Sequence, residues 1–197
     1  MGFYSFVRVL TKVVFFLFFR VKFEGLENIP ESGNFILCSN HRSNLDPFFL
    51  GVKIEKRVNY MAKSELFKNK FFAKIFLKLG AFPVYRGTGD MKVIEKAVEI
   101  INNGEVLAIF PEGTRSKDGI PLKPKSGISL IAGKTKADIL PAVIYFRGKL
   151  GLFKKVTVRY GKIIKYEEIP QTEQDVKSMK ATSNFIMGKI ISLLEEK

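Results

Sequence analysis

Short, wholly apolar runs alternate with amphipathic segments along most of this chain, and that alternation constrains its fold more than any other feature. The run VLAIF at 106–110 carries no polar residue, which is typical of a strand buried on both faces of a sheet. Strands that alternate with helices predict an α/β fold, with a mixed or mostly parallel sheet flanked by helices. The predicted strands are 34–39, 57–61, 82–85, 106–110, 139–145 and 156–161, and the predicted helices are 46–53, 65–79, 90–103, 126–135 and 172–196.

The amino-terminal residues 1–24 are set apart from the α/β domain, 25–197, by their dense aromatic and basic residues. Arg8 and Lys12 interrupt the segment, so its longest uncharged stretch falls far short of the ~20 residues that a membrane span needs. Its sequence does not resemble a secretory signal, because no small-residue cleavage site follows it.

A helix through this segment places Ser5, Arg8, Thr11 and Lys12 near one side and Phe and Val over the rest. This pattern predicts an interfacial membrane-binding helix, with its apolar side among the acyl chains and its cations at headgroup level. Packing on the protein's own core, or a true span, are the alternatives. A second aromatic and basic stretch, 66–78, can reach the same interface.

The charge of the chain indicates a polyanionic partner, because 33 Lys and Arg face 19 Asp and Glu, giving a net charge of +14. The sequence has 19 Phe and no Trp, which fits an anionic membrane surface better than base stacking. We find no zinc-finger spacing, no RNA-recognition signature and no arginine-rich tail, so nucleic acid is not the expected partner. The expected location is the cytoplasmic face of the cell membrane, with monotopic or peripheral attachment.

One cysteine and one histidine exclude an ordinary Cys/His zinc site. Cys38 lies in a predicted buried strand and is expected to be a core residue. His41 follows the same strand, in Asn40–Pro47, at the edge where α/β sheets bind ligands. Asp46 lies five residues on, about 140° away on a helix, so the two can meet only if the chain turns between them. A carboxylate on one ring nitrogen would leave the other as a base, whereas the alternative is a helix-capping Asp beside a turn histidine.

Two further strand ends carry groups suited to an anion. The segment FPEGTRS, 110–116, offers Gly113, Thr114 and Arg115 for phosphate contacts, and FPVYRG, 82–87, ends in Arg86. Each could instead be a polar turn with a solvated arginine. If the strands are parallel, both segments meet His41 at one edge of the sheet, as expected for an acceptor that carries a hydroxyl and a phosphate.

The absence of a nucleophile motif narrows the reaction. No G-x-S-x-G elbow is present, and the only cysteine is predicted to be buried. These features argue against a covalent acyl-enzyme and leave general-base activation of a substrate hydroxyl, which attacks an acyl thioester directly.

Four blocks in this order resemble the glycerophospholipid acyltransferases, specifically the bacterial 1-acyl-sn-glycerol-3-phosphate acyltransferases. They are NHRSNLD at 40–46, AFPVYRG at 81–87, FPEGTRS at 110–116 and ILPAVI at 139–144. The first block contains the His-x4-Asp pattern of the family. The resemblance covers roughly residues 20–165.

The resemblance implies that His41 is the general base and that Asp46 orients it, while Arg86 and Arg115 hold the acceptor phosphate. It implies that Glu112 and Gly113 shape that site, with Glu112 ordering an arginine. Two further residues resemble family residues: Lys63, in a weaker match, and Pro141 on the acyl-donor side.

The implied substrates are lysophosphatidic acid, acylated at its sn-2 hydroxyl to phosphatidic acid, and acyl-CoA or acyl-carrier protein as donor. No metal and no redox cofactor is implied. The alternatives are another acceptor on the same machinery, such as glycerol-3-phosphate or a different lysolipid, and a non-catalytic basic membrane-binding module.

Overall fold

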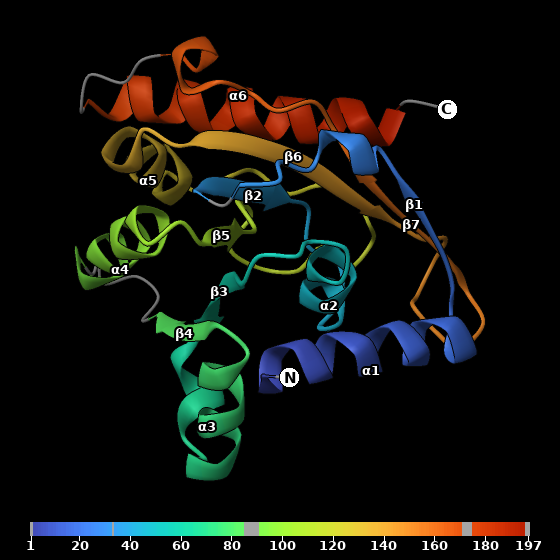
Figure 1. Cartoon of the computed structure of the whole chain (residues 1–197). Helices are drawn as coiled ribbons and strands as arrows, with labels where there is room; N and C mark the ends of the chain where they lie inside the picture. Colours follow the sequence, from blue (N-terminus) through green and yellow to red (C-terminus); the bar gives the residue numbers. More distant parts are fainter. Residues whose placement is uncertain (1, 33, 85–90, 171–174, 196–197) are drawn as a thin grey trace.

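The computed structural model describes residues 2–32, 34–84, 91–170 and 175–195, which form one twisted sheet between two layers of helices (Figure 1). The sheet has seven strands in the order β1-β7-β6-β2-β5-β3-β4. The strands are β1 Arg20–Glu24, β2 Phe35–Ser39, β3 Val58–Lys63, β4 Ala81–Val84, β5 Val106–Ile109, β6 Asp138–Tyr145 and β7 Lys155–Tyr160.

The pairing of the strands confirms the predicted mixed, mostly parallel sheet. Strands β6, β2, β5, β3 and β4 run parallel to one another, whereas β7 is antiparallel to β6, and β1 runs parallel to β7. All six predicted strands are present, and their ends differ from the prediction by at most two residues. The predicted strand 82–85 ends at Tyr85, which lies outside the described residues.

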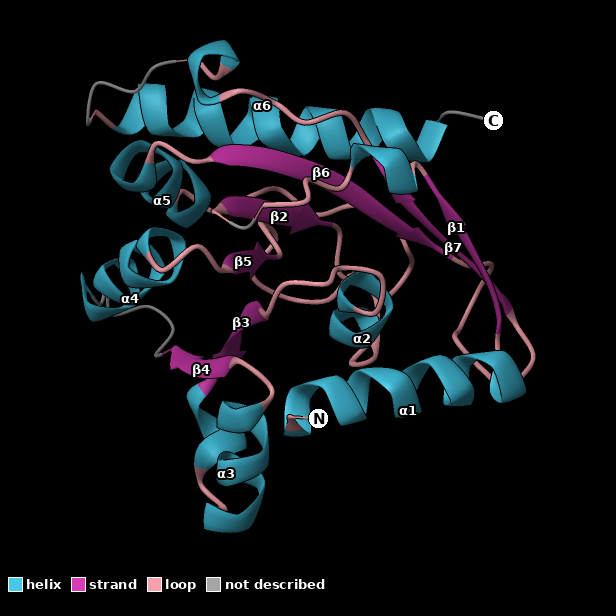
Figure 2. Ribbon diagram, in the orientation of Figure 1, coloured by secondary structure: helices cyan, strands magenta, loops and turns pink. Residues whose placement is uncertain are grey.

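Helices cover both faces of the sheet (Figure 2). Helices α4, α5 and α6 pack on one face, and α1 and α2 pack on the other. Successive residues of β2 serve the two layers in turn, because Ile36 and Cys38 face the first and Phe35 and Leu37 face the second. The helices are α1 Phe3–Phe18, α2 Asp46–Gly51, α3 Lys70–Lys78, α4 Met91–Asn102, α5 Gly127–Thr135 and α6 Val176–Glu195, with short 3-10 helices η1 Leu26–Asn28, η2 Ser64–Phe67 and η3 Tyr166–Glu168.

The predicted helix 65–79 is two elements, η2 and α3, separated at Asn69. The backbone of Asn69 is extended, and its side-chain oxygen accepts hydrogen bonds from the amides of Phe71 and Phe72. Asparagine is a strong helix-capping residue, so the local sequence restarts the helix here.

Strand β1 is absent from the predicted strands, and the prediction of a helical segment over 1–24 is wrong at its end. Helix α1 stops at Phe18, and Arg20–Glu24 joins the sheet at its edge. Among the described residues the strand pairs with β7 alone, about 135 residues further along the chain, and Arg159 Nε contacts Glu24 Oε2 at 2.6 Å. A partner so distant in sequence leaves no local signal.

Helix α1 turns its polar side towards the protein and most of its apolar side outwards. Arg8 donates to the carbonyls of Ile54 at 3.0 Å and Glu55 at 2.9 Å, and the Tyr4 hydroxyl accepts from the Val58 amide at 3.1 Å. The expectation that Arg8 lies at headgroup level is therefore wrong: it satisfies carbonyls of the α2–β3 connection. Within the part of the chain that is described, no helix combines the length and hydropathy of a membrane span.

Candidate active site

The carboxyl ends of four parallel strands meet at one edge of the sheet, among them the three strands, β2, β4 and β5, for which the sequence predicted it. Strand β2 leads into His41, β5 leads into Phe110–Arg115, and β3 ends in Lys63. Strand β4 leads towards Arg86, which lies outside the described residues. This edge is where open α/β sheets bind ligands.

His41 and Asp46 form the predicted pair. His41 Nδ1 lies 2.8 Å from Asp46 Oδ2, and the turn between them is closed by the Asp46 amide, which donates to the Ser43 carbonyl. The same carboxylate oxygen accepts from the amides of Arg42 at 2.6 Å and Ser43 at 2.7 Å. Asp46 is 0% exposed, at the start of α2. Since Oδ2 only accepts, the proton of the neutral ring belongs on Nδ1, and Nε2 keeps its lone pair.

The segment after β5 fixes the position of His41. The Phe110 ring stacks on the imidazole with centroids 4.0 Å apart, and the His41 carbonyl accepts from the Ser116 amide at 2.8 Å. The His41 amide donates to Glu112 Oε1 at 2.8 Å. The sequence blocks 40–46 and 110–116 are therefore joined through both the ring and the main chain of His41.

Within the described residues, Glu112 orders the backbone and contacts no arginine. It is 1% exposed, and its other oxygen, Oε2, accepts from the Leu122 amide at 2.9 Å. Burial raises the pKa of the Glu112 carboxyl above its ordinary value, while the amides of Leu122 and His41 act in the opposite direction. Its two oxygens thus connect the His41 turn to the segment around Leu122, a role that sequence reasoning missed.

Two other residues of the first block also hold this turn and were not predicted to do so. The Asn40 side chain donates to the Ile144 carbonyl at 3.0 Å and accepts from its amide at 2.8 Å, so it extends the pairing of β2 with β6. The Arg42 guanidinium donates to the carbonyls of Phe146 at 2.5 Å and Gly148 at 3.2 Å and lies over the Phe146 ring. Their signal in the sequence is that both flank the only histidine.

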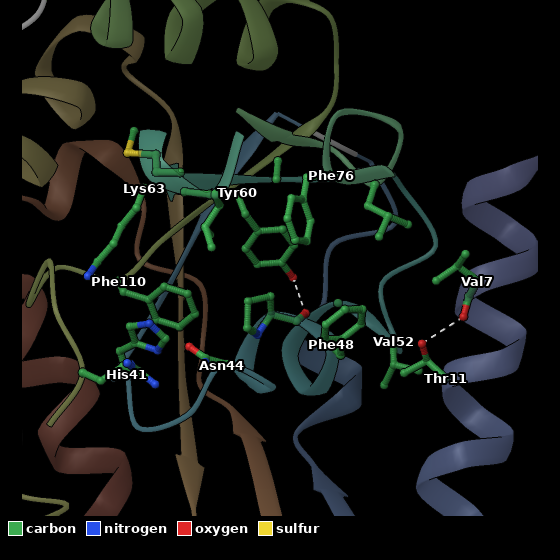
Figure 3. Close-up of a pocket in the computed structure, with 18 of the residues that line it drawn as sticks. Val7, Thr11, His41, Asn44, Phe48, Val52, Tyr60, Lys63, Phe76 and Phe110 are labelled. Atoms are coloured by element: carbon green, nitrogen blue, oxygen red, sulfur yellow. Dashed lines mark hydrogen bonds between the residues drawn. The ribbon is translucent and has the colours of Figure 1, made fainter. Parts of the chain in front are cut away.

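A cavity of about 550 Å³ extends from His41 towards α1 (Figure 3). Its wall near His41 includes Asn44, Lys63, Thr114 and Arg115. The remainder is mostly apolar and includes Val7, Phe48, Val52, Tyr60, Met61, Leu66, Phe76 and Leu79; its polar members are Tyr4, Arg8 and Thr11 of α1. The cavity therefore joins a cationic, hydrogen-bonding end to a hydrophobic slot.

The other predicted residues lie either at the mouth of the cavity or inside the sheet. Arg115 and Lys63 are exposed at the cavity mouth, and Gly113 has a φ of +67°, which favours glycine at this turn. Pro141 is not among the described residues that line the cavity: it is buried in β6, paired with Cys38, and its carbonyl accepts from the Gly161 amide.

Cys38 is fully buried, and burial raises the pKa of its thiol far above the ordinary value, so it is not a nucleophile.

Comparison with known proteins gives the same family at the level of sequence and of fold. A family model described as "Acyltransferase" matches residues 20–145. The 1-acyl-sn-glycerol-3-phosphate acyltransferase of Bacillus subtilis is 36% identical over 140 residues, covering 71% of this chain and 69% of the relative. A chloroplastic enzyme of the same name from Arabidopsis thaliana is 31% identical over 136 residues, 68% of this chain and only 38% of the relative.

The crystal structure of the 1-acyl-sn-glycerophosphate acyltransferase PlsC from Thermotoga maritima superposes with a TM-score of 0.75 at 25% identity, covering 98% of this chain and 80% of the other. The family match includes β2, β5 and both blocks that hold His41. The chain therefore belongs to the acyltransferase family, with bacterial 1-acyl-sn-glycerol-3-phosphate acyltransferases among its relatives.

Proposed function

We propose that this protein transfers a fatty acyl group from acyl-CoA or acyl-carrier protein to the sn-2 hydroxyl of 1-acyl-sn-glycerol-3-phosphate, forming phosphatidic acid. The observation that carries the proposal is the His41–Asp46 pair at the cationic end of an apolar cavity. The names of the relatives from Bacillus subtilis and Thermotoga maritima support the same acceptor.

His41 Nε2 is the base of the proposed reaction. It takes the proton of the acceptor hydroxyl while the oxygen attacks the thioester carbonyl, and Asp46 stabilises the imidazolium that forms. The tetrahedral intermediate then collapses with cleavage of the carbon–sulfur bond, and the proton on His41 passes to the leaving thiolate. The new ester and the free thiol balance the reaction without a metal or a redox cofactor.

The acceptor phosphate is assigned to the cationic rim. Arg115, Thr114 and Lys63 line the cavity together with His41, and Arg86 joins them in the proposal on the strength of its place after β4. Arginine suits this role because its guanidinium can hold two phosphate oxygens at once. The apolar part of the cavity is assigned to a fatty acyl chain.

Membrane docking at the cytoplasmic face is part of the proposal. Large apolar side chains are exposed on the outer side of α1 and on η2 and α3. All three elements contribute residues to the cavity wall. The exposed side chains are Phe3, Phe6, Val9, Leu10, Val13, Val14, Phe16, Leu17 and Phe18 on the first, and Leu66, Phe71, Phe72 and Leu77 on the others. Docking through these side chains would bring the cavity to the surface where its lipid substrate resides.

The test is acyl transfer by the full chain on vesicles, with acyl-CoA and acyl-carrier protein as donors. We expect turnover with lysophosphatidic acid, little with monoacylglycerol, which lacks the phosphate, and little with glycerol-3-phosphate, which lacks the acyl chain. His41→Ala should lower kcat by roughly 100- to 10,000-fold and leave vesicle binding unchanged.

Three results would contradict the proposal. Turnover with another lysolipid but none with lysophosphatidic acid would refute the assigned acceptor. Near-normal turnover by His41→Ala would show that His41 is not the base. A wild type without acyl transfer to any acceptor, but with vesicle binding, would favour the alternative of a non-catalytic membrane-binding module.

A further inference from the structure

The connection between β6 and β7, residues 146–154, ends in an exposed apolar tip. Leu152 and Phe153 are 64% and 63% exposed. The Phe153 amide donates to the Phe18 carbonyl at 2.7 Å, and the Arg20 amide donates to the Lys154 carbonyl at 3.1 Å. The tip therefore lies beside the carboxyl end of α1, where β1 and β7 begin (Figure 1).

Neither packing nor backbone geometry explains the phenylalanine at this position. Phe153 has a φ of +59°, in the left-handed region that a bulky side chain rarely occupies. The conformation would suit glycine or asparagine, and the ring covers little of the protein's own surface. A strained, exposed aromatic residue of this kind indicates a function in binding.

The charged residues that neighbour the tip in the sequence are all of one sign. Leu152 and Phe153 are followed by Lys154 and Lys155 and preceded by Arg147 and Lys149, and no acidic residue occurs in the sequence between Asp138 and Glu167. Basic residues next to exposed apolar ones match an anionic lipid surface, with the apolar groups below the headgroups and the cations among them.

We infer that the Leu152–Phe153 tip is a membrane anchor that enters the same leaflet as the outer side of α1. The two apolar surfaces are continuous, because Phe16, Leu17 and Phe18 at the end of α1 are exposed and the tip bonds to Phe18. The inference rests on the membrane docking in the proposed function and adds a second anchor, 135 residues from the first along the chain.

The other end of the same connection is attached to the active site. Arg42, next to His41, holds the carbonyls of Phe146 and Gly148. One connection thus links the lipid-facing tip to the turn that carries the base, which fixes how the cavity is oriented when the tip is inserted.

The absence of tryptophan from the chain allows a direct test, since each introduced Trp is the only one. Three variants of the full chain are compared on phosphatidylglycerol and phosphatidylcholine vesicles with brominated acyl chains: Phe153→Trp at the tip, Phe16→Trp on α1, and Val176→Trp as control. Phe16 and Val176 are 86% and 79% exposed, on helices at opposite sides of the molecule.

We expect the fluorescence of the tip and α1 variants to shift to the blue and to be quenched on the anionic vesicles, and that of the control variant to be unchanged. Quenching of the α1 variant alone would refute the tip anchor and leave the docking of α1 intact. Quenching of neither would refute the docking in the proposed function. A blue shift of the tip variant in buffer that grows with protein concentration would assign the tip to contact between copies, against the inference.

Phe153→Gly separates lipid binding from a structural role. We expect vesicle binding roughly tenfold weaker, from loss of one buried aromatic side chain, with a thermal midpoint equal to or above that of the wild type, because glycine adopts this φ without strain. A lower thermal midpoint with unchanged vesicle binding would show that the ring supports the fold instead.

Discussion

His41 is positioned through its main chain as well as its ring. The ring nitrogen is held by Asp46, and the amide and carbonyl are held by Glu112 and Ser116. Glu112 can accept from two amides only as a carboxylate, yet it is buried, and burial raises the pKa of its carboxyl above the ordinary value. The position of His41, the proposed base, therefore depends on whether the Glu112 carboxyl is ionised.

Glu112→Gln tests this link at the level of one residue. The amide group of Gln can accept from only one of the two backbone amides and points a donor at the other, so we expect kcat/KM to fall by up to roughly 100-fold, as for loss of ~1.5–3 kcal/mol in a charged hydrogen bond. Glu99→Gln, which removes an exposed carboxylate on α4, is the matched control and should have no effect.

As the pH rises and the Glu112 carboxyl loses its proton, we expect the stability of the fold to fall and the activity to rise. Because the pKa of Glu112 is raised in the folded state, its contribution to stability is present below the ordinary glutamate value and is lost as the pH rises through the folded pKa. The thermal midpoint of the wild type should therefore fall relative to that of Glu112→Gln across this window, while wild-type activity rises. A difference in thermal midpoint that does not vary with pH would contradict this assignment.

Among the elements, α1 has an unusual role, because it lines the cavity with Tyr4, Val7, Arg8 and Thr11 while it presents most of its apolar side outwards. Arg8 and Tyr4 make its polar contacts with the α2–β3 connection and β3, and Phe15 stacks on Phe49 with ring centroids 4.3 Å apart. Two hydrogen bonds from one arginine therefore hold a wall of the proposed acyl-chain site.

Arg8→Met should loosen α1 without removing the volume of the side chain. We expect faster hydrogen exchange along Phe3–Phe18 and a kcat/KM lowered by roughly tenfold, since two hydrogen bonds, one of them partly buried, are lost together with the donor to the carbonyls of Ile54 and Glu55. Lys12→Met removes the same charge from an exposed position of the same helix and serves as the control. Equal effects of the two variants would mean that the lost positive charge, and not the attachment of α1 to the α2–β3 connection, explains the result.

At the scale of the whole molecule, a net charge of +14 acts together with the apolar surfaces of α1 and α3. We expect binding to phosphatidylglycerol vesicles to weaken as salt rises to ~1 M, where the Debye length is about 3 Å, and to approach the level measured on phosphatidylcholine vesicles. Cosedimentation of the full chain at several salt concentrations measures this. Binding to anionic vesicles that does not respond to salt would show that the positive charge is not used for docking.

The sequence by itself determined the fold class, the family and the pair at the centre of the site. Apolar runs separated by amphipathic segments indicated the parallel strands, and the residues between His41 and Asp46 allowed the turn that joins them at 2.8 Å. These features are local, because the period of the apolar residues and the residue types of a turn can both be read from a few consecutive positions of the sequence.

Only the tertiary structure decided which distant segments support that pair. The contact of Glu112 with the His41 amide joins residues 71 apart, the bonds of Arg42 to Phe146 and Gly148 join residues 104 and 106 apart, and β1 pairs with β7 across most of the chain. The direction of α1 was also decided there, because the carbonyls of Ile54 and Glu55 hold Arg8 against the protein. This orientation leaves four phenylalanines of the helix exposed: Phe3, Phe6, Phe16 and Phe18. Such partners are set by how the sheet is assembled, and a single sequence carries no local mark of them.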